Sequence, residues 1–311
     1  MTHVVVLGTG GTIAGLARDP GDTVGYASAQ VGVEALVRSA AGGNAPEIEA
    51  EQVAQIDSKD MDFDTWRRLA TRVAWHAARP EVAGVVVTHG TDTLEETAWF
   101  LARLLPLDKP VLLTGAMRPA SARAPDGPGN LADAIALAAS GDPAGVHVVF
   151  AGSVHAPADV RKVHPLRVDA FASGEEGPIG RVAGAAFERL RPSPATEALG
   201  IELLPAAGAP WPWVEIVASG AGIDGRAVRA LVAAGVDGLV VAATGNGSMQ
   251  ASLEAALLEL RVPALRATRC LDGRTVEAER ASPGVPSAPG LTPAKARVEL
   301  LLQLLARRPR G

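Results

Sequence analysis

The stretch MTHVVVLGTGGTIAG, residues 1–15, joins a short apolar run to a cluster of glycines that contains Thr9 and Thr12. An apolar run that leads into glycines is typical of the first strand of a parallel sheet and the turn after it. The glycines serve one of two purposes. They cradle a phosphate, or they clear space around a threonine that reacts.

The dinucleotide-binding fingerprint Gly-x-Gly-x-x-Gly is incomplete in this stretch. Counted from Gly8, its third glycine is replaced by Ile13. The acidic residue that binds a ribose is expected about 20 residues further on. Asp22 comes too early, and no second strand leads up to it. The chain also lacks a Gly-Lys pair, which the Walker phosphate loop requires. A nucleotide-binding oxidoreductase is therefore excluded.

The composition is that of an ordinary globular protein. The chain has 311 residues, 48% of them hydrophobic, and this length predicts about two domains. The net charge of −5 favours neither nucleic acid nor a membrane as a partner. No apolar run reaches the roughly 18 residues of a membrane helix, and the start Met1-Thr2-His3 does not resemble a secretory signal. The single cysteine, Cys270, excludes an internal disulfide, so we expect a cytoplasmic protein.

Apolar runs of strand length alternate with segments of helical periodicity through the first half of the chain. The strand candidates are residues 3–7, 51–57, 82–88, 110–115 and 146–151. The helix candidates are residues 31–41, 62–79, 93–105 and 129–140. Thr93 and Glu96 are expected to form a capping box at the start of the third of these helices. This alternation predicts parallel strands joined by right-handed crossovers, with helices on both faces of the sheet.

The pattern is interrupted at RPSPATEALGIELLPAAGAPWP, residues 191–212, which we interpret as an interdomain linker. After it, strand candidates 213–218, 238–243 and 263–268 alternate with helix candidates 223–234 and 250–259, and a closing helix is expected within residues 291–308. The predicted fold class is α/β. A larger N-terminal parallel-sheet domain of the flavodoxin-like type spans residues 1–190, and a smaller Rossmann-like domain spans residues 213–311.

Polar clusters follow the first three strand candidates. They are Thr9-Gly10-Gly11-Thr12, Asp57-Ser58-Lys59-Asp60 and Thr88-His89-Gly90-Thr91-Asp92. The carboxyl ends of parallel strands share one edge of a sheet, where ligands bind, so we expect the clusters to face one pocket. A threonine hydroxyl becomes a nucleophile when a base activates it. Lysine can act as such a base, and Lys162 is one of only a few lysines in the chain.

Each of these residues also has a purely structural interpretation. Gly10 and Gly11 permit a tight turn, and the serine, threonines and aspartates are good helix caps. Tyr26 lies in a glycine- and aspartate-rich loop, and Lys162 can be a surface charge. The histidines lack metal-ligand spacing, and neither His-Glu-x-x-His nor Gly-x-Ser-x-Gly occurs, so we expect no metal site and no serine-hydrolase site. The joint placement of the clusters favours a reacting threonine.

The clusters lie within segments that resemble the bacterial L-asparaginase family. These segments are TGGTIAG at 9–15, DSKDM at 57–61, THGTDTLEETA at 88–98 and LTGAMRP at 113–119. Similarity at ATGNGS, residues 243–248, and LTPAKAR, residues 291–297, extends the resemblance over nearly the whole chain. It implies hydrolysis of L-asparagine to L-aspartate and ammonia through a covalent acyl-threonine intermediate, without a cofactor and with L-glutamine as a minor substrate. It also implies a larger N-terminal and a smaller C-terminal α/β domain.

The resemblance assigns a role to each matching residue. It implies that Thr12 is the nucleophile, hydrogen-bonded to Tyr26 on a loop that closes over the substrate. It implies that Thr91, Lys162 and Asp92 form a second, triad-like group, and which group acts first as general base stays open. The residues expected to contact the substrate are Gly11, Ser58, Thr91, Asp92 and Ala116, with Ser58 holding the α-carboxylate, Asp92 the α-amino group and the Ala116 backbone the scissile amide.

Members of this family assemble as dimers or tetramers in which the partner's C-terminal domain completes the active site. The resemblance therefore predicts a homodimer or homotetramer with shared sites. Asn246 matches the asparagine that the partner supplies, and Glu277 or Glu279 matches its glutamate, because the segment around them aligns poorly. Lys59 stands where the family often has a small or amide side chain, so its charge is expected to affect carboxylate binding or substrate preference.

Two other functions fit the same motifs. One is the amide-hydrolysing subunit of a tRNA-dependent amidotransferase, which usually has an additional N-terminal domain and a nucleic-acid surface. The net negative charge disfavours it. The other is a non-catalytic sensor of small amino acids. A sensor needs the contacts of Ser58 and Asp92 but no nucleophile, so the presence of Thr12, Thr91 and Lys162 favours an enzyme.

Overall fold

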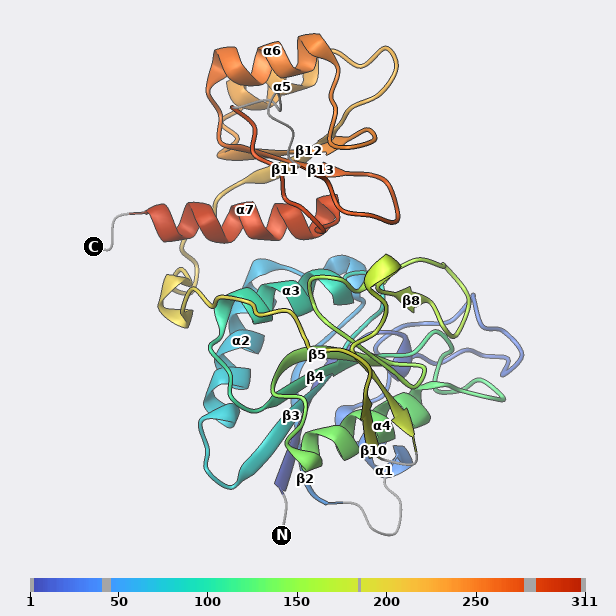
Figure 1. Cartoon of the computed structure of the whole chain (residues 1–311). Coiled ribbons are helices and arrows are strands. Elements are labelled where there is room, and N and C mark those ends of the chain that lie inside the picture. Colours follow the sequence, from blue (N-terminus) through green and yellow to red (C-terminus); the bar gives the residue numbers. More distant parts are fainter. Residues whose placement is uncertain (1–2, 41–45, 184–185, 277–283, 309–311) are drawn as a thin grey trace. The chain divides into compact units, whose positions relative to one another are not determined.

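The computed structural model describes residues 3–40, 46–183, 186–276 and 284–308. The chain splits into two compact units, residues 1–201 and 202–311 (Figure 1). The boundary falls within the proline-rich stretch 191–212, where a short 3-10 helix, η4 (Ile201–Leu203), forms. Within the described part of the chain, no helix is long and apolar enough to cross a membrane.

The first unit is built on one large sheet with the strand order β10-β9-β6-β5-β4-β3-β1-β2. Its parallel strands are β1 (His3–Gly10), β2 (Glu47–Ile56), β3 (Val82–Thr88), β4 (Pro110–Thr114) and β5 (Gly145–Phe150). The register sets Val5 beside Val85 and Val85 beside Val111, so a row of buried valines crosses the middle of the sheet. The predicted parallel core is confirmed.

The sheet continues beyond β5 with antiparallel strands that the sequence did not predict. They are β6 (Ser153–His155), β9 (Gly180–Ala183) and β10 (Ala186–Arg189). Each is too short for alternating polarity to be recognised in the sequence. The sheet is therefore mostly rather than entirely parallel. A separate two-stranded pair, β7 (Arg161–Lys162) and β8 (Phe171–Ala172), carries Lys162, and the 3-10 helix η3 (Gly174–Glu176) follows it.

Helices cover both faces of the large sheet (Figure 1). The pair α2 (Phe63–Ala77) and α3 (Leu94–Leu104) lies on one face, and the pair α1 (Val33–Ala40) and α4 (Gly127–Ser140) lies on the other. Successive side chains of a strand point to opposite faces. Val4 and Val6 of β1 accordingly join the core beneath α1 and α4, while Val5 and Leu7 point to the opposite face and are equally buried. This burial on both faces explains why the central strands are apolar at nearly every position.

The second unit is a smaller three-layer domain. Its parallel sheet has the order β11-β12-β13, with β11 (Val214–Ala218), β12 (Gly238–Ala243) and β13 (Ala264–Thr268). The helices α5 (Arg226–Ala233) and α6 (Ala251–Leu260) cover one face, and α7 (Pro293–Arg307) covers the other (Figure 1). Thr292 caps α7 by accepting a hydrogen bond from the backbone N–H of Lys295. The predicted second α/β sheet and closing helix are confirmed.

Two histidines are buried in the large sheet. His147 on β5 bonds Ser193 Oγ through Nε2 at 2.9 Å, and His155 on β6 bonds Ser173 Oγ through Nδ1 at 2.8 Å. Burial lowers the pKa of each histidine to about 4, because the charged imidazolium would lose its hydration. Both side chains are therefore neutral at neutral pH.

These histidines should make the free energy of unfolding depend on pH. Between the unfolded pKa of 6.5 and the folded pKa of about 4, the unfolded chain binds protons that the folded chain does not. Stability is therefore fully present above the unfolded pKa and falls as the pH drops, by about 1.4 kcal/mol per pH unit for each histidine. Urea unfolding of the wild type and His147→Gln at about pH 7, 6 and 5 measures this slope. The slope should be shallower in His147→Gln, and equal slopes would contradict the assignment.

Candidate active site

The loops after β1 and β3 touch through their glycines. Gly11 has φ 82° and ψ −170°, a conformation that essentially only glycine adopts. A Cβ added to Gly11 would lie 2.3 Å from Gly90 Cα, so the two backbones are in direct contact. The loop after β2 joins them, because Gly11 N donates to Ile56 O at 2.9 Å and a Cβ on Gly90 would meet Ser58 Oγ at 2.5 Å. The three predicted polar clusters therefore converge.

Thr12 begins the 3-10 helix η1 (Thr12–Ala14) directly after this contact and is buried. Its Oγ1 lies 2.6 Å from Tyr26 Oη, and either hydroxyl can be the donor. A bridge between Leu16 and Ala27 returns the chain and brings Tyr26 beside Thr12. A Cβ on Gly15 would lie 2.8 Å from the tyrosine ring, so this glycine is what allows the ring to approach. The sequence-predicted pair of Thr12 and Tyr26 is thus brought together.

Thr91, Asp92 and Lys162 form one hydrogen-bonded group. Lys162 Nζ donates to Thr91 Oγ1 at 2.9 Å and to Asp92 Oδ1 at 2.7 Å. Thr91 is buried, whereas the Asp92 side chain is half exposed and can reach a ligand. The backbone N–H of Lys162 donates to Glu95 Oε2 at 2.7 Å, so the first turn of α3 also holds the lysine in place. Nothing in the sequence pattern singled out Glu95.

Ser58 lies buried at the start of the 3-10 helix η2 (Ser58–Asp60). Its Oγ accepts a hydrogen bond from Asp92 N at 3.2 Å, and its backbone carbonyl accepts one from Thr93 Oγ1 at 2.8 Å. The predicted capping box is therefore wrong. Thr93 occupies the N-cap position of α3, but its hydroxyl bonds the loop after β2 and makes no cap hydrogen bond to the helix.

The loop 115–118 after β4 contains Ala116, which is buried. Asp126 and Asn130, near the start of α4, hold this loop. The N–H groups of its last two residues donate to the two carboxylate oxygens of Asp126 at 2.9 Å each, and Asn130 Nδ2 donates to the carbonyl of its first residue at 2.9 Å. Neither residue was predicted from the sequence. An aspartate just before Pro128 is a helix-start signal, so the motif predicts a cap rather than a loop anchor.

The Lys59 side chain points to solvent in this structure. Its ammonium forms an exposed ion pair with Asp60, and this hydrogen bond raises the pKa of Lys59. Asn246 belongs to the second unit, where its side-chain amide bonds both the N–H and the C=O of Val276, at 2.7 and 2.9 Å. Glu277 and Glu279 lie outside the described residues.

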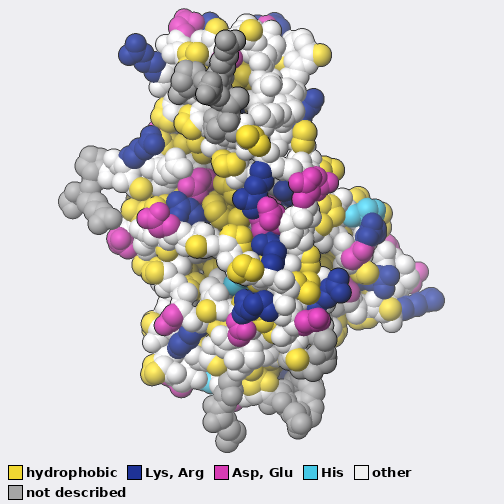
Figure 2. Space-filling view, viewed as in Figure 1, with side chains coloured by type: hydrophobic (Ala, Val, Ile, Leu, Met, Phe, Trp, Pro, Cys, Tyr) yellow, Lys and Arg dark blue, Asp and Glu magenta, His cyan; other side chains and the backbone are white. Residues whose placement is uncertain are grey.

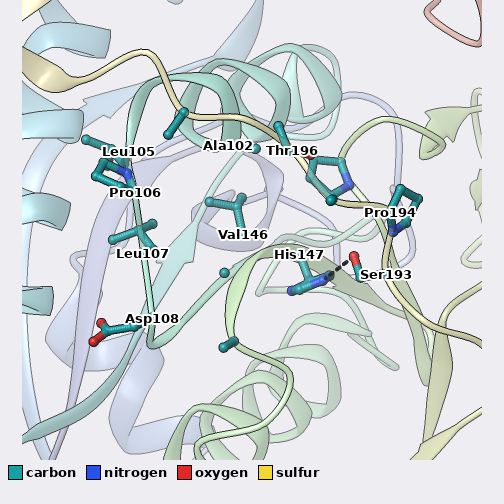
Figure 3. A pocket seen from close by; sticks show the side chains of 15 residues that line it. Ala102, Leu105, Pro106, Leu107, Asp108, Val146, His147, Ser193, Pro194 and Thr196 are labelled. Atoms are coloured by element: carbon teal, nitrogen blue, oxygen red, sulfur yellow. Dashed lines mark hydrogen bonds between the residues drawn. The ribbon is translucent and has the colours of Figure 1, made fainter.

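A cavity of about 740 Å³ elsewhere in the first unit contains none of these residues (Figure 3). It is lined by the loop before β4, the start of β5 and the segment 193–198. These are the amino ends of parallel strands, and the threonine loops follow the carboxyl ends, so the cavity and the site lie at opposite edges. In its wall, His147 Nε2 and Ser193 Oγ are hydrogen-bonded to each other (Figure 3). Within the described ranges, no group of three or more His, Cys, Asp and Glu side chains could hold a metal ion.

Known proteins share this architecture. A family model described as "Asparaginase, N-terminal" matches residues 3–194, and one described as "Glutaminase/Asparaginase C-terminal domain" matches residues 213–309. L-asparaginase 2 of Escherichia coli is 34% identical over 313 residues, which cover 98% of this chain and 89% of the relative. A glutaminase-asparaginase of Pseudomonas fluorescens is 36% identical over 269 residues, 84% of this chain and 73% of the relative. The solved structure of a probable cytoplasmic L-asparaginase from Campylobacter jejuni matches with a TM-score of 0.88 at 34% identity, covering 98% of this chain and 95% of that one.

Gly11→Ala should destabilise the protein by about 3 kcal/mol or more, because the new Cβ meets the backbone of Gly90 and the required φ and ψ are unfavourable for alanine. Gly129→Ala is the matched control. It lies within α4 with no neighbouring atom within 4 Å of an added Cβ, so the substitution should be neutral or stabilise by up to about 1 kcal/mol. Urea unfolding compares the two variants, and equal stabilities would contradict the close contact.

Proposed function

This chain belongs to the bacterial L-asparaginase family, and from that membership we propose that it hydrolyses the side-chain amide of L-asparagine to L-aspartate and ammonia. The observation that carries the proposal is the contact of Gly11 with Gly90. The residues that follow these glycines, Thr12 and Thr91, both come after the carboxyl ends of the neighbouring parallel strands β1 and β3. Hydroxyls that converge from separate loops suit acyl transfer better than they suit simple binding.

Thr12 is the proposed nucleophile. Its Oγ1 attacks the carboxamide carbon and loses its proton to a base, while the carbonyl oxygen becomes an oxyanion. The tetrahedral intermediate then breaks its C–N bond, and the nitrogen takes up a proton and leaves as ammonia. Water adds to the remaining acyl-threonine ester and loses a proton, and Thr12 departs with a proton as L-aspartate is released. The steps need only side chains of this chain and water.

Two groups share the proton transfers in this proposal. Tyr26 Oη is the first acceptor, because it lies 2.6 Å from Thr12 Oγ1. The group of Thr91 and Lys162 serves the leaving nitrogen and the incoming water. Because Lys162 Nζ donates to Thr91 Oγ1, the hydroxyl proton of Thr91 remains available for donation to the substrate.

The α-carbon groups of the substrate have complementary partners. Ser58 Oγ accepts its hydrogen bond from Asp92 N and thus keeps its own proton to donate to the α-carboxylate. The half-exposed carboxylate of Asp92 suits the α-ammonium group. The backbone at Ala116, held by Asp126 and Asn130, is proposed to meet the scissile amide, and the bare backbone of Gly11 admits the substrate beside Thr12.

We further propose that the active enzyme is a homodimer or homotetramer whose sites are shared. Asn246 and either Glu277 or Glu279 would then serve the site of a neighbouring subunit. The intact asparagine in the GNGS motif supports this proposal. In the described structure the Asn246 amide bonds the backbone of Val276, which directly precedes Glu277 in the sequence.

The cytoplasm is the compartment we propose. The name of the Campylobacter relative supports it, as does the free and exposed Cys270. Positive and negative side chains intermingle on the face shown in Figure 2, which fits a small-molecule enzyme better than a nucleic-acid-binding subunit.

Glutaminase activity is the second candidate, because the Pseudomonas relative is named glutaminase-asparaginase. L-Glutamine is one methylene longer, so its amide must fit the same distance between Ser58 and Thr12. Lys59, which follows Ser58, is the residue whose charge we propose to affect the preference between L-asparagine and L-glutamine. In this structure Lys59 forms an ion pair with Asp60.

Ammonia release from L-asparagine and L-glutamine, measured in parallel, tests the proposed reaction. We expect release from L-asparagine by the wild type and a loss of at least about 1,000-fold in Thr12→Ala, which removes the attacking oxygen. Thr12→Ala should still bind L-aspartate. Wild-type activity in Thr12→Ala would contradict the nucleophile assignment. Binding of aspartate without turnover by the wild type would instead indicate a sensor.

Lys162→Met should lower kcat by at least about 100-fold with little change in melting temperature, because it removes the proton-handling amine and keeps the apolar stem. Lys109→Met is the control, since Lys109 Nζ donates to Arg79 O at the amino end of β4, far from the loops of the site. It should keep wild-type kcat. A large loss of stability in Lys162→Met, without a change in kcat, would make Lys162 a structural residue.

A further inference from the structure

A chain of buried polar side chains leads from two helices to the loop after β3. Trp66 on α2 donates through Nε1 to Thr97 Oγ1 on α3 at 2.8 Å, and Thr97 Oγ1 lies 2.9 Å from His89 Nε2. His89 Nδ1 in turn lies 2.7 Å from the carbonyl oxygen of Gly90. His89 is fully buried, so it touches no substrate, and the proposed reaction does not use it.

The series begins at the Trp66 indole N–H and ends at the Gly90 carbonyl, and these two groups decide which nitrogen of His89 carries the proton. The indole N–H of Trp66 can only donate, so Thr97 accepts there and uses its single proton toward His89 Nε2. The Gly90 carbonyl can only accept, so His89 Nδ1 must donate to it. Burial lowers the pKa of His89 to about 4, so the ring has one proton at neutral pH. Both ends require the same tautomer, with the proton on Nδ1.

The carbonyl that His89 holds belongs to a peptide at the centre of the site. Gly90 packs between Ser58 and Gly11, and a Cβ on it would lie 2.5 Å from Ser58 Oγ and 3.1 Å from Gly11 Cα. The same planar peptide carries the backbone N–H of Thr91. A hydrogen bond that orients the Gly90 carbonyl therefore also orients the Thr91 amide and the start of the Thr91 side chain.

We propose that His89 is a positioning residue whose Nδ1–H tautomer, imposed by Trp66 and Thr97, fixes the Gly90–Thr91 peptide for the reaction. The inference deepens the proposed function and rests on it, because it gives the fixed peptide a purpose. Two helices thereby act on the nucleophile loops through one imidazole. Gly90 has no side chain that could orient its own peptide group, and the contact with Ser58 leaves no room for one. A hydrogen bond from a neighbouring side chain therefore has to orient it.

Thr97 offers the sharpest test, because valine has nearly the same shape and lacks the hydroxyl. Thr97→Val removes the donor to His89 Nε2, so the preference for the Nδ1–H tautomer should weaken. We expect kcat for L-asparagine to fall by at least about tenfold, or about 1.4 kcal/mol, with KM changed by less than about threefold. Thr97→Ser restores the hydroxyl and should return kcat to within about twofold of the wild type. Thr65→Val, which removes another buried hydroxyl, beside Trp66 on α2 but outside this chain, should keep wild-type kcat.

The tautomer is read directly from long-range ¹H–¹⁵N spectra of protein labelled with ¹⁵N-histidine, with His89→Gln identifying the His89 signals. The wild type should show a protonated Nδ1 and an unprotonated Nε2. This reading does not require turnover, so it separates failure of the inference from failure of the proposed function. A wild-type Nε2–H tautomer would overturn the proposal. Unchanged kcat in a folded Thr97→Val whose spectrum has altered would also overturn it.

Discussion

The contact between the backbones of Gly11 and Gly90 is the constraint on which the site depends. At this distance neither residue can carry a Cβ, and φ and ψ at Gly11 exclude other residue types in any case. The contact ties the loop after β1 to the loop after β3, and Ser58 packs on Gly90 from the loop after β2. The loops that carry Thr12 and Thr91 are thus joined through backbone atoms alone. The glycines allow one stretch of backbone to pack directly against another.

A second feature is that the N-cap residues of α3 and α4 stabilise loops rather than the first turns of their own helices. Thr93 and Asp126 both occupy N-cap positions, yet neither makes a side-chain cap hydrogen bond. Thr93 bonds the loop of Ser58, and Asp126 bonds the loop 115–118. A cap typically contributes about 1 kcal/mol, and here the helices forgo it. Thr93 and Asp126 instead hold the two loops that are proposed to bind substrate. The helices are less stable without the caps, and the site is more rigid.

The regular part of the fold followed from periodicity, and the irregular part did not. Long apolar runs and helical stripes have enough residues to show their period, so the parallel strands and covering helices were correctly predicted. The antiparallel strands β6, β9 and β10 have four residues or fewer and show none. Among the candidate site residues, motifs indicated the threonines, Ser58 and Lys162. Glu95, Asp126 and Asn130 were missed because their partners are backbone groups of other loops.

By itself the sequence determined the α/β class, the position of three polar clusters at the ends of strands, and the family, because these depend on local period and on contiguous motifs. Only the tertiary structure decided that Thr93 bonds Ser58 instead of its helix, that Asp126 and Asn130 hold the loop 115–118, and that His89 lies between Thr97 and the Gly90 carbonyl. Each of these contacts joins backbone or side-chain atoms whose approach is set by the path of the whole chain. A hydroxyl, carboxylate or imidazole can form hydrogen bonds with several different partners. Which partner it bonds is known only once the packed structure shows which groups lie near it.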